Sequence, residues 1–539
     1  MNMNRHVSLF TMRHRATTTL AILSFILLAA TGANAAPTLT VPSLAVSTVV
    51  TGITQATSMA FIGSDEFLIL EKASGRVKRV VSGIVTATVL DLPVNSNSER
   101  GLLGIALDPN FFTNHNVYLY WTESSTGADS NVVTEVGNPA SPYSPGTPQP
   151  LGNRVDRFTW DATTQTLTYA ANLIRLRAYQ NDKNNTQVPA AFTPQGNHNG
   201  GKLAMGPDGK LFIIIGDNGR RGWMQNLQNG PYLPTAADDQ FGGPAPDDNH
   251  LTGVILRLNT DGSAPADNPF FAAGAALGGQ VGANIQKVYS YGHRNSFGLA
   301  FDPLSGNLWD SENGDDSFDE INKIVPGGNY GWVQSMGPIS RISQFKTIES
   351  YLFNPATAPI GAIQQLRYPV TRIAYSPATT LSRMLMLPGA SYQDPELSWR
   401  YAVPPSGLGF VSGNGLGASY NGTLWSGEAR TTNITGGSTG TFSGGALMVM
   451  RLTADRQHLD LSADLRLADR VADNGVAYPP PFGTPAGTAG YKFDGKESES
   501  LLIGQGFGIT TDIKTGPDGC LYVVSNTDNA VYKICGTLP

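Results

Sequence analysis

Short runs of alternating apolar and polar residues, separated by turns, cover most of the chain. The typical unit is an apolar stretch, a turn that contains proline or aspartate-glycine, and a second run that is almost wholly apolar. Alternation with a period of two predicts half-buried strands, and a short continuous apolar run between turns predicts a strand buried on both faces. Long helical periodicity is nearly absent, so the pattern predicts an all-β protein.

This unit recurs six times. Its copies lie at 58–72, 104–123, 203–217, 299–313, 408–428 and 513–526. Hairpins repeated radially are typical of β-propellers, whose four-stranded blades pack face to face around a central channel. Further strands after some copies, such as 71–81 and 253–263, would complete the blades. Six copies therefore predict a six-bladed β-propeller.

Long segments of biased composition separate the repeats. They lie at 124–152, 218–250, 333–396, 430–445 and 472–495. Loops of this length within a compact domain are usually functional or disordered. We expect these long loop insertions to gather on one rim of the propeller and to shape a pocket there.

The first 35 residues have the pattern of a secretory signal peptide. Three arginines precede the apolar stretch 18–32, and "ANAAP" then supplies small residues for cleavage after Ala35. We expect residues 1–35 to be removed and residues 36–539 to form a single propeller domain, periplasmic or secreted, with no membrane span. A retained amino-terminal anchor is the alternative.

Charge and cysteine content narrow the expected partners. The formal net charge is −6, which disfavours nucleic acid because phosphate binding requires a basic surface. The two cysteines, Cys520 and Cys535, flank two alternating strands joined by the turn "NTDN". A hairpin about Thr527 and Asp528 would place them opposite each other, and an exported chain would form a disulfide there. Reduced core thiols are the alternative, and a zinc site is excluded because no histidines lie nearby.

Two histidines stand in glycine- and asparagine-rich turns before repeat strands. His198 lies in "GNHNGG" and His293 in "GHRN", so each is either a turn residue or a group that points into the channel. The stretch that follows His293 is dense in acids, with Glu312, Asp315, Asp316, Asp319 and Glu320. Such oxygen ligands suit calcium, although their spacing is not that of an EF-hand and a solvated acidic loop is the alternative.

Six motifs in order resemble one family. They are "ERGLLGIALDPNF", "NHNGGKLAMGPDGKLFIIIGD", "GVILRLNTDGSAPADNPF", "YGHRNSFGLAFDPLSGNLW", "DEINKIVPGGNYGW" and "WRYAVPPSGLGF". From about residue 45 to 535 the chain is similar to the soluble quinoprotein sugar dehydrogenases of the glucose/sorbosone dehydrogenase family. The resemblance implies a six-bladed propeller that holds pyrroloquinoline quinone (PQQ) over calcium, oxidises the anomeric hydroxyl of an aldose to a lactone, and passes electrons to an external acceptor.

The resemblance also implies roles for single residues. His198 falls at the position of the general base, and Arg294 at that of a cation that stabilises charge on the quinone. Residues expected beside the cofactor are Glu99, Arg294, Asn295, Trp399 and Arg430. Residues expected at calcium are Gly314 and Asp315, through backbone carbonyls at the catalytic ion, and Asp319, Glu320 and Tyr330 at a second, structural ion.

The sequence departs from the family where cations are expected. Ile509 and Thr511 stand where the family has arginines, and Ala429 stands near a family lysine, although PQQ carries three carboxylates. Arg430 and Lys514 are close enough in sequence to compensate. Three hypotheses follow: a PQQ-dependent sugar dehydrogenase, which the motifs favour; a non-catalytic carbohydrate- or protein-binding propeller that has lost PQQ; and a calcium-dependent hydrolase or lactonase on the same fold.

Overall fold

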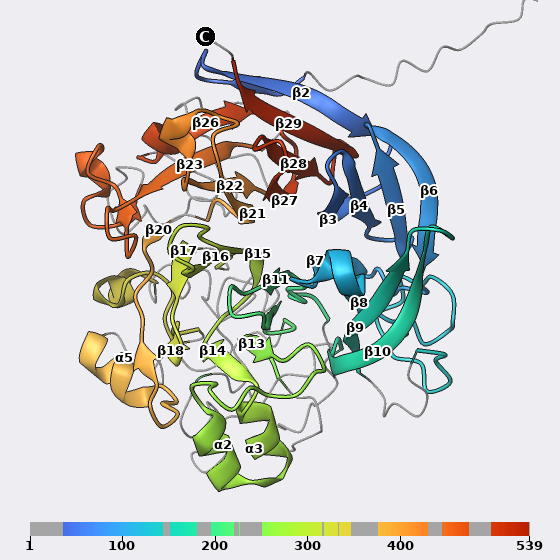
Figure 1. The fold of residues 1–539 in the computed structure, drawn as a ribbon. Coiled ribbons are helices and arrows are strands. Elements are labelled where there is room, and N and C mark those ends of the chain that lie inside the picture. The colour runs from blue at the N-terminus through green and yellow to red at the C-terminus, as the bar shows by residue number, and fades with distance from the viewer. Residues whose placement is uncertain are drawn as a thin grey trace, which may run out of the picture. The chain divides into compact units, whose positions relative to one another are not determined.

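Six sheets, one for each sequence repeat, make up the fold (Figure 1). The computed structural model describes residues 36–143, 151–179, 196–219, 226, 251–314, 317–332, 334–345, 376–400, 402–429, 445–473 and 497–537. These residues belong to one unit, 36–539. The expected signal peptide, Asp315 and Arg430 lie outside the described residues.

The first three blades follow one another along the chain. Blade 1 contains β3 (Ala56–Gly63), β4 (Glu66–Glu71), β5 (Arg76–Val81) and β6 (Ile84–Asp91). Blade 2 contains β7 (Leu102–Leu107), β8 (Asn116–Thr122), β9 (Gly152–Asp161) and β10 (Thr166–Arg177). Blade 3 contains β11 (Leu203–Met205), β12 (Leu211–Ile215), β13 (Val254–Leu258) and β14 (Val288–Tyr291), extended by β18 (Gly328–Asn329) and β19 (Ser391–Tyr392).

The last three blades include strands from distant parts of the chain. Blade 4 contains β15 (Ser296–Phe301), β16 (Leu308–Glu312), β17 (Asp319–Ile324), β20 (Leu397–Trp399) and β25 (Val471–Ala472). Blade 5 contains β21 (Pro405–Phe410), β22 (Leu424–Glu428), β23 (Leu447–Leu452), β26 (Leu502–Gln505), β1 (Thr38–Leu39) and β24 (Leu459–Asp460). Blade 6 contains β27 (Thr510–Thr515), β28 (Leu521–Ser525), β29 (Ala530–Gly536) and β2 (Leu44–Thr51).

The innermost strands form a closed ring. In chain order β3, β7, β11, β15, β21 and β27 each contact the next, and β27 contacts β3 (Figure 1). The ring is closed by pairing between the two ends of the described chain, because β2 is antiparallel to β29. The predicted β-propeller is thus confirmed, and the described residues give one sheet for each of the six predicted repeats.

The second strand of each repeat is buried on both faces, as its continuous apolar run predicts. Every residue of β12 and of β28 is buried, whereas Val89 is the only buried residue of the outer strand β6. Tryptophans fill the space between neighbouring sheets, among them Trp121, Trp309 and Trp425, all fully buried. Packing of this kind is expected where sheets stack face to face.

The disulfide between Cys520 and Cys535 is present, with an Sγ–Sγ distance of 2.03 Å. Because Leu521 pairs with Ile534, Cys520, the residue directly before β28, lies opposite Cys535 of β29. This is the arrangement expected from the predicted hairpin.

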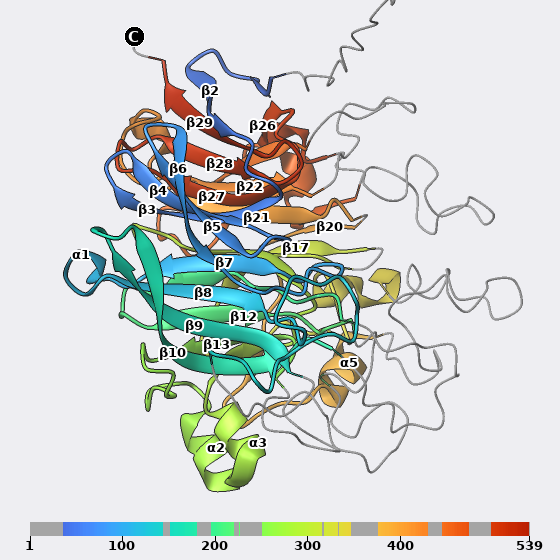
Figure 2. The ribbon, with the colours of Figure 1, turned by 90° about the vertical axis from the view of Figure 1, so that its right-hand side faces the viewer.

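Helices are short and lie outside the ring of inner strands. Those in the described residues are α1 (Phe111–Asn114), α2 (Phe271–Leu277), α3 (Gly279–Ile285) and α5 (Pro377–Arg383), with 3₁₀ turns at Ile339–Arg341, Ala418–Tyr420, Leu465–Leu467 and Glu499–Leu501. Figure 2 shows α1 and α5 at opposite faces of the propeller. Among the described helices, none is long and apolar enough to cross a membrane.

The two faces of the propeller contain opposite ends of the inner strands. At the amino-terminal ends of these strands lie the turns with Glu99, His198 and Arg294, each within a few residues of a strand start. Toward the carboxyl-terminal ends lies a cavity of about 350 Å³ with largely apolar walls. All six inner strands contribute to it, through Met59, Ile105, Leu203, Leu299, Phe410 and Ile513. The polar candidates therefore share the other end of the channel.

Candidate functional site

His198 is held in an unusual backbone conformation. Its φ of 57° is left-handed, which costs a residue other than glycine about 1 kcal/mol or more. Its backbone N–H donates to Glu99 Oε2 at 2.7 Å, and its carbonyl accepts from the N–H of Asn218 at 3.3 Å. The turn therefore fixes the position of the imidazole through contacts to two other segments.

Asp217 orients the His198 ring. The Nδ1 of His198 lies 2.5 Å from Asp217 Oδ1, and both side chains are buried. Asp217 also accepts from the N–H of Gly219 at 2.8 Å and from Trp332 Nε1 at 3.0 Å. Because a carboxylate accepts, Nδ1 carries the proton and Nε2 has the lone pair. In the described part of the chain, Nε2 has no hydrogen-bond partner.

The charge of Asp217 is stabilised by its neighbours. Burial opposes its ionisation, but the hydrogen bond from His198, the charge of His198 when it is protonated, the charge of Arg294 and the N–H of Gly219 outweigh burial and hold the pKa of Asp217 below its usual range. The ionised carboxylate fixes the tautomer with the proton on Nδ1, and it faces the positive charge that forms when Nε2 takes up a proton. The pair can therefore accept a proton at Nε2 and store it.

Glu99 and Asn295 connect the His198 turn to the neighbouring blades. Asn295 Nδ2 donates to Glu99 Oε2 at 3.0 Å, and Asn295 Oδ1 accepts from the N–H of Gly200 at 3.2 Å. Glu99 precedes β7, His198 precedes β11 and Asn295 precedes β15. Three of the residues expected at the site thus meet where three inner strands begin.

Arg294 lies beside this group with its guanidinium buried. Its backbone carbonyl accepts from the N–H of Asp217 at 2.7 Å, and its NH1 donates to the carbonyl of Asn313 at 2.9 Å. The guanidinium carbon is 5.8 Å from the centre of the Trp332 ring, within the range of a cation–π contact. Trp332 therefore contacts both the acid that orients His198 and the cation expected at the site.

His293 has both ring nitrogens engaged. Nδ1 lies 2.9 Å from Glu312 Oε2, Nε2 lies 2.9 Å from Ser290 Oγ, and the ring stacks on Tyr330 at 4.7 Å. Glu312 Oε1 also accepts from the backbone N–H of Arg294. Burial opposes the charged form, yet Glu312 and then Asp310 raise the pKa of His293 above its ordinary value. His293 supports the turn, and it has no free nitrogen for a substrate.

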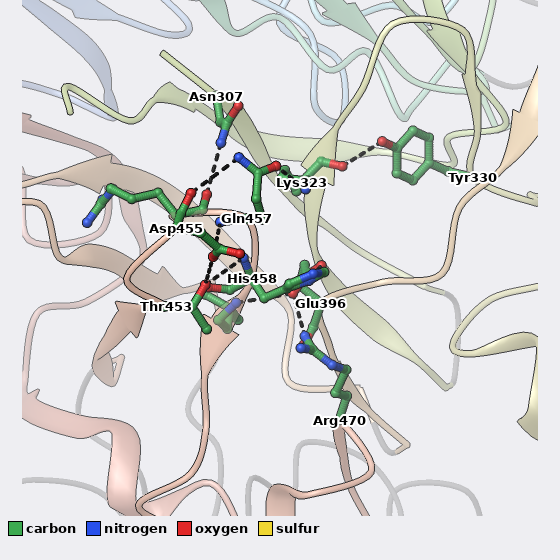
Figure 3. A network of polar contacts seen from close by, with 11 residues as sticks. Asn307, Lys323, Tyr330, Glu396, Thr453, Asp455, Gln457, His458 and Arg470 are labelled. Atoms are coloured by element: carbon green, nitrogen blue, oxygen red, sulfur yellow. Dashed lines mark hydrogen bonds and ion pairs between the residues drawn. The ribbon is translucent and has the colours of Figure 1, made fainter. Parts of the chain in front are cut away.

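Among the described residues expected at calcium, the side chains of Asp319, Glu320 and Tyr330 make separate contacts. Asp319 uses both carboxylate oxygens to hold loops, accepting from the N–H of Gly314 at 2.7 Å and of Val403 at 2.6 Å. Glu320 is the next residue of β17, so its side chain points to the other face of the sheet, where it accepts from the N–H of Gly337 at 2.6 Å. The Tyr330 hydroxyl donates to the Lys323 carbonyl at 2.6 Å (Figure 3).

Trp399 lies apart from the other candidates. It is fully buried in β20, an outer strand of blade 4, and its indole N–H donates to Ser498 Oγ at 3.0 Å. The structure therefore brings together Glu99, His198, Arg294 and Asn295, and it does not bring Trp399 to them.

Positions 509, 511 and 429 lie in the described chain and carry no cation. The Thr511 hydroxyl donates to the Ala56 carbonyl at 2.9 Å. The next carbonyl along β3, that of Thr57, accepts from Lys202 Nζ at 3.0 Å. Lys202 is buried, and Asp512 Oδ1 lies 3.8 Å from its ammonium. Burial lowers the pKa of Lys202 to about 8. A buried ammonium thus lies close to a position where the resemblance expects an arginine.

Asp217 and Trp332 belong to the candidate site, and the sequence alone did not point to them. Asp217 stands in "GDNG" directly after a buried strand, and Trp332 ends "GGNYGW". The repeat itself offered a signal, because the second strand of blade 4 also ends with an acid, Glu312. The contact between Trp332 and Asp217 joins residues 115 positions apart and has no local signature.

The fold and site define a β-propeller with a buried histidine–carboxylate pair and an arginine at one end of its channel. The family model for "Glucose / Sorbosone dehydrogenase" matches residues 53–344, a range that includes every residue of this group. The chain belongs to this family.

Three proteins with sequences similar to this chain show how far the similarity extends. Quinoprotein glucose dehydrogenase B of Acinetobacter calcoaceticus is 33% identical over 280 residues, covering 51% of this chain and 49% of that protein. The matched part thus spans about half the length of this relative. An uncharacterized protein of Synechocystis is 28% identical over 498 residues, covering 90% and 85%. Aldose sugar dehydrogenase YliI of Escherichia coli is 27% identical over 277 residues, covering 51% and 58%.

Solved structures share the fold at lower identity. The soluble aldose sugar dehydrogenase of Escherichia coli, in its apo form, matches with a TM-score of 0.53 at 19% identity, covering 92% of this chain and all of that one. The PQQ-bound aldose sugar dehydrogenase of Streptomyces coelicolor matches with a TM-score of 0.50 at 20% identity, covering 93% and 99%. These matches support the propeller architecture.

Proposed function

We propose that this protein is an exported sugar oxidoreductase that oxidises the anomeric hydroxyl of an aldose, or a related sugar, to a lactone with PQQ and calcium. The observation that supports this most directly is the His198–Asp217 pair, whose open Nε2 lies in the same group as Arg294 and Asn295. Family membership supports the reaction class, and the names of the aligned relatives support sugar as the substrate.

In this mechanism His198 Nε2 accepts the proton of the anomeric hydroxyl. Asp217 stabilises the imidazolium that forms, and the left-handed turn holds the ring in place. A positioned general base of this kind contributes about 10²- to 10⁴-fold to a rate. PQQ, when bound, supplies the two-electron acceptor for the hydride that leaves the anomeric carbon as its carbonyl bond forms. Arg294 then stabilises negative charge beside the site.

The described residues offer partners for PQQ. Its carboxylates need cations and donors, and Arg294, Asn295 and the buried ammonium of Lys202 provide them near the starts of the inner strands. Two buried hydroxyls, Ser406 Oγ and Thr510 Oγ1, have no hydrogen-bond partner in the described chain. Thr510 stands between positions 509 and 511, where the resemblance expects arginines for the PQQ carboxylates. A carboxylate oxygen of PQQ at this place would accept a hydrogen bond from the Thr510 hydroxyl. Arg430 remains a proposed further cation.

A second candidate function is a non-catalytic propeller that binds a carbohydrate or a protein and has lost PQQ. It is favoured by Ile509, Thr511 and Ala429, which carry no charge at the expected cationic positions. The Glu99 carboxylate is also committed to the protein, through His198 N and Asn295 Nδ2. The two functions differ in whether PQQ binds.

Export to the periplasm or the exterior is part of the proposal. It is supported by the signal-like residues 1–35 and by the disulfide, because disulfides persist in oxidising compartments. An external electron acceptor and a small sugar are the expected partners.

The test uses purified mature protein with calcium, titrated with PQQ and followed by quinone absorbance and by dye reduction with a panel of aldoses. We expect saturable PQQ binding and dye reduction in the wild type, and loss of dye reduction in His198→Gln. His458→Gln is the matched control, because His458 also pairs with a carboxylate but is half exposed outside this site. Absence of both PQQ binding and dye reduction would refute the proposal, and sugar binding without PQQ binding would favour the second candidate.

A further inference from the structure

The cavity at the carboxyl-terminal ends of the inner strands has no role in the proposed reaction. Its volume is about 350 Å³, which is within the range of small-molecule sites. It lies toward the face of the propeller that carries α1, the helix that follows β7, and away from the turns with His198 and Arg294 (Figure 2). A ligand in this cavity would therefore not compete for the candidate site.

The walls of the cavity combine apolar side chains with one charged residue. Every inner strand contributes apolar residues, which include the aromatic side chains of Phe61, Phe301 and Phe410. Among the described residues that line the cavity, Lys514 alone carries a charge. Its side chain is 35% exposed, so a solute can reach the ammonium group. Lys514 stands close in sequence to the positions where the resemblance expects arginines, and the structure places it at this cavity.

Positive charge beside the cavity exceeds negative charge. Asp512 Oδ1 lies 3.7 Å from Lys514 Nζ and 3.8 Å from Lys202 Nζ. In the part of the chain that the structure describes, neither ammonium group pairs with another acid. Asp512 Oδ2 also accepts from Ser58 Oγ at 2.6 Å and from the N–H of Met59 at 3.0 Å. One carboxylate therefore serves two ammonium groups, and one positive charge is left for an external anion.

Lys514 is the ammonium group of the two that a ligand can reach. Lys202 is buried and donates to the Thr57 carbonyl at 3.0 Å, whereas Lys514 Nζ forms no hydrogen bond within the described residues. Burial lowers the pKa of Lys202 to about 8. Asp512 opposes this shift, and the positive charge of Lys514 adds to it. An anion beside Lys514 would offset the repulsion between the two ammonium groups.

We propose that this cavity binds an organic anion that has a single carboxylate and an unbranched apolar chain. The carboxylate contacts the ammonium of Lys514, and the chain lies against the apolar residues of the inner strands. Hydrogen bonds between an ammonium and a carboxylate are stronger than neutral ones, and burial of an alkyl chain adds affinity in proportion to its length. Leu304, which follows the lining residue Pro303, is 55% exposed and extends the apolar surface beyond the cavity.

The competing explanation is that water alone fills this end of the channel. Lys514 would then be an ordinary solvated lysine, and neither the chain length nor the charge of a solute would affect binding. Because the cavity is separate from the proposed sugar site, the two explanations can be compared without PQQ.

The first experiment titrates the mature chain with hexanoate, octanoate and decanoate, below their micelle concentrations, by isothermal titration calorimetry. We expect one molecule to bind per chain, with an affinity that rises about three- to fourfold for each added methylene group. Octan-1-ol, a neutral probe of the same length, should bind at least about tenfold more weakly than octanoate because it lacks a charge for Lys514. Absence of saturable binding by all three acids, or equal affinity for octanol and octanoate, would overturn the proposal.

Variants then locate the ligand. Lys514→Met removes the ammonium group but keeps the length of the side chain, so it should weaken octanoate binding about tenfold or more, whereas Lys514→Arg should retain it. Ser412→Trp adds bulk at an exposed residue that lines the cavity, and it should weaken the binding of octanoate and octanol alike. Lys210→Met is the matched control, because Lys210 lies directly before β12 on the same face and does not line the cavity.

Each outcome decides the matter. The proposal is wrong if Lys514→Met or Ser412→Trp binds octanoate with the wild-type affinity, or if Lys210→Met weakens binding as much as Lys514→Met does. A melting curve checks that each variant folds. If Lys514→Met does not fold, Ser412→Trp and the comparison of octanoate with octanol in the wild type still test the site.

Discussion

Two histidine–carboxylate pairs occupy equivalent places in neighbouring blades. His198 and Asp217 bracket the first two strands of blade 3, and His293 and Glu312 bracket those of blade 4, with the same separation of 19 residues. All four side chains are buried. The pairs differ at the second ring nitrogen, because Ser290 occupies Nε2 of His293 and no described residue bonds to Nε2 of His198. The same histidine–carboxylate arrangement is therefore a candidate general base in blade 3, where Nε2 of His198 is available to a substrate.

A third pair shows the same chemistry without burial. His458 lies 2.9 Å from Glu396 at the outer edge of the propeller, and Glu396 also pairs with Arg470 (Figure 3). The His458 side chain is 52% exposed. Water competes for its ring nitrogens, so this pair contributes little to stability and serves as a control for the two buried pairs.

The largest effect should come from breaking the open pair. His198→Gln removes the base at Nε2, and we expect kcat for sugar oxidation to fall by about 10³-fold, within the range for general-base catalysis. Tm should fall as well, because the buried Asp217 loses its imidazole partner. Steady-state dye reduction and a melting curve measure both quantities. A fall of similar size in His458→Gln would mean that burial and location do not distinguish the pairs.

Breaking the closed pair should mainly reduce stability. Glu312→Gln leaves His293 and the Arg294 N–H without their carboxylate, and loss of one partner of a buried pair costs about 3 kcal/mol or more. Denaturant unfolding monitored by tryptophan fluorescence gives this free energy. If Glu312→Gln unfolds with the wild-type free energy, the closed pair has no structural role.

Asp217→Asn should lower kcat by about 10²-fold while leaving substrate KM similar, because the imidazolium of His198 loses its stabilising charge. The pH dependence follows from the lowered pKa of Asp217. A carboxyl with a depressed folded pKa stabilises the fold above its unfolded pKa of about 3.9, and this contribution is lost as pH falls through the folded pKa. The difference in unfolding free energy between wild type and variant should therefore shrink below about pH 4, and a constant difference would contradict this assignment.

The smallest effect is expected for Ser290→Ala. It opens Nε2 of His293 by removing one buried hydrogen bond, which costs about 1 kcal/mol. Activity should stay within a factor of two, because His293 remains buried beneath the turn. A tenfold change in kcat would show that the second nitrogen of His293 takes part in the reaction.

The sequence was sufficient to predict the propeller because its signal is local and repeated. Each turn and apolar run specifies one hairpin, and six copies specify the ring. The cysteine hairpin was equally local. Helices α2 and α3 were not predicted, since "FAAGAAL" and "GQVGANI" contain glycine and have no side-chain cap.

The site was only partly predictable because much of it depends on contacts between blades. His198, Arg294, Asn295 and Glu99 were identified from motifs, but Asp217 and Trp332 meet only after the ring has formed. The expected calcium ligands Asp319 and Glu320 show a different limit of the sequence. They are adjacent residues of β17, so their side chains point to opposite faces of the sheet, which the motif "DE" alone does not reveal.

The pairing of β2 with β29 has a consequence for how the chain reaches its native state. Leu44 pairs with Gly536, so blade 6 receives its fourth strand from the opposite end of the described chain. During synthesis the ring cannot close until the last hairpin is complete, and pairing between such distant segments is slow. We expect ring closure to be the late, rate-limiting step of folding, with the Cys520–Cys535 bond holding β28 and β29 together while β29 waits for its partner.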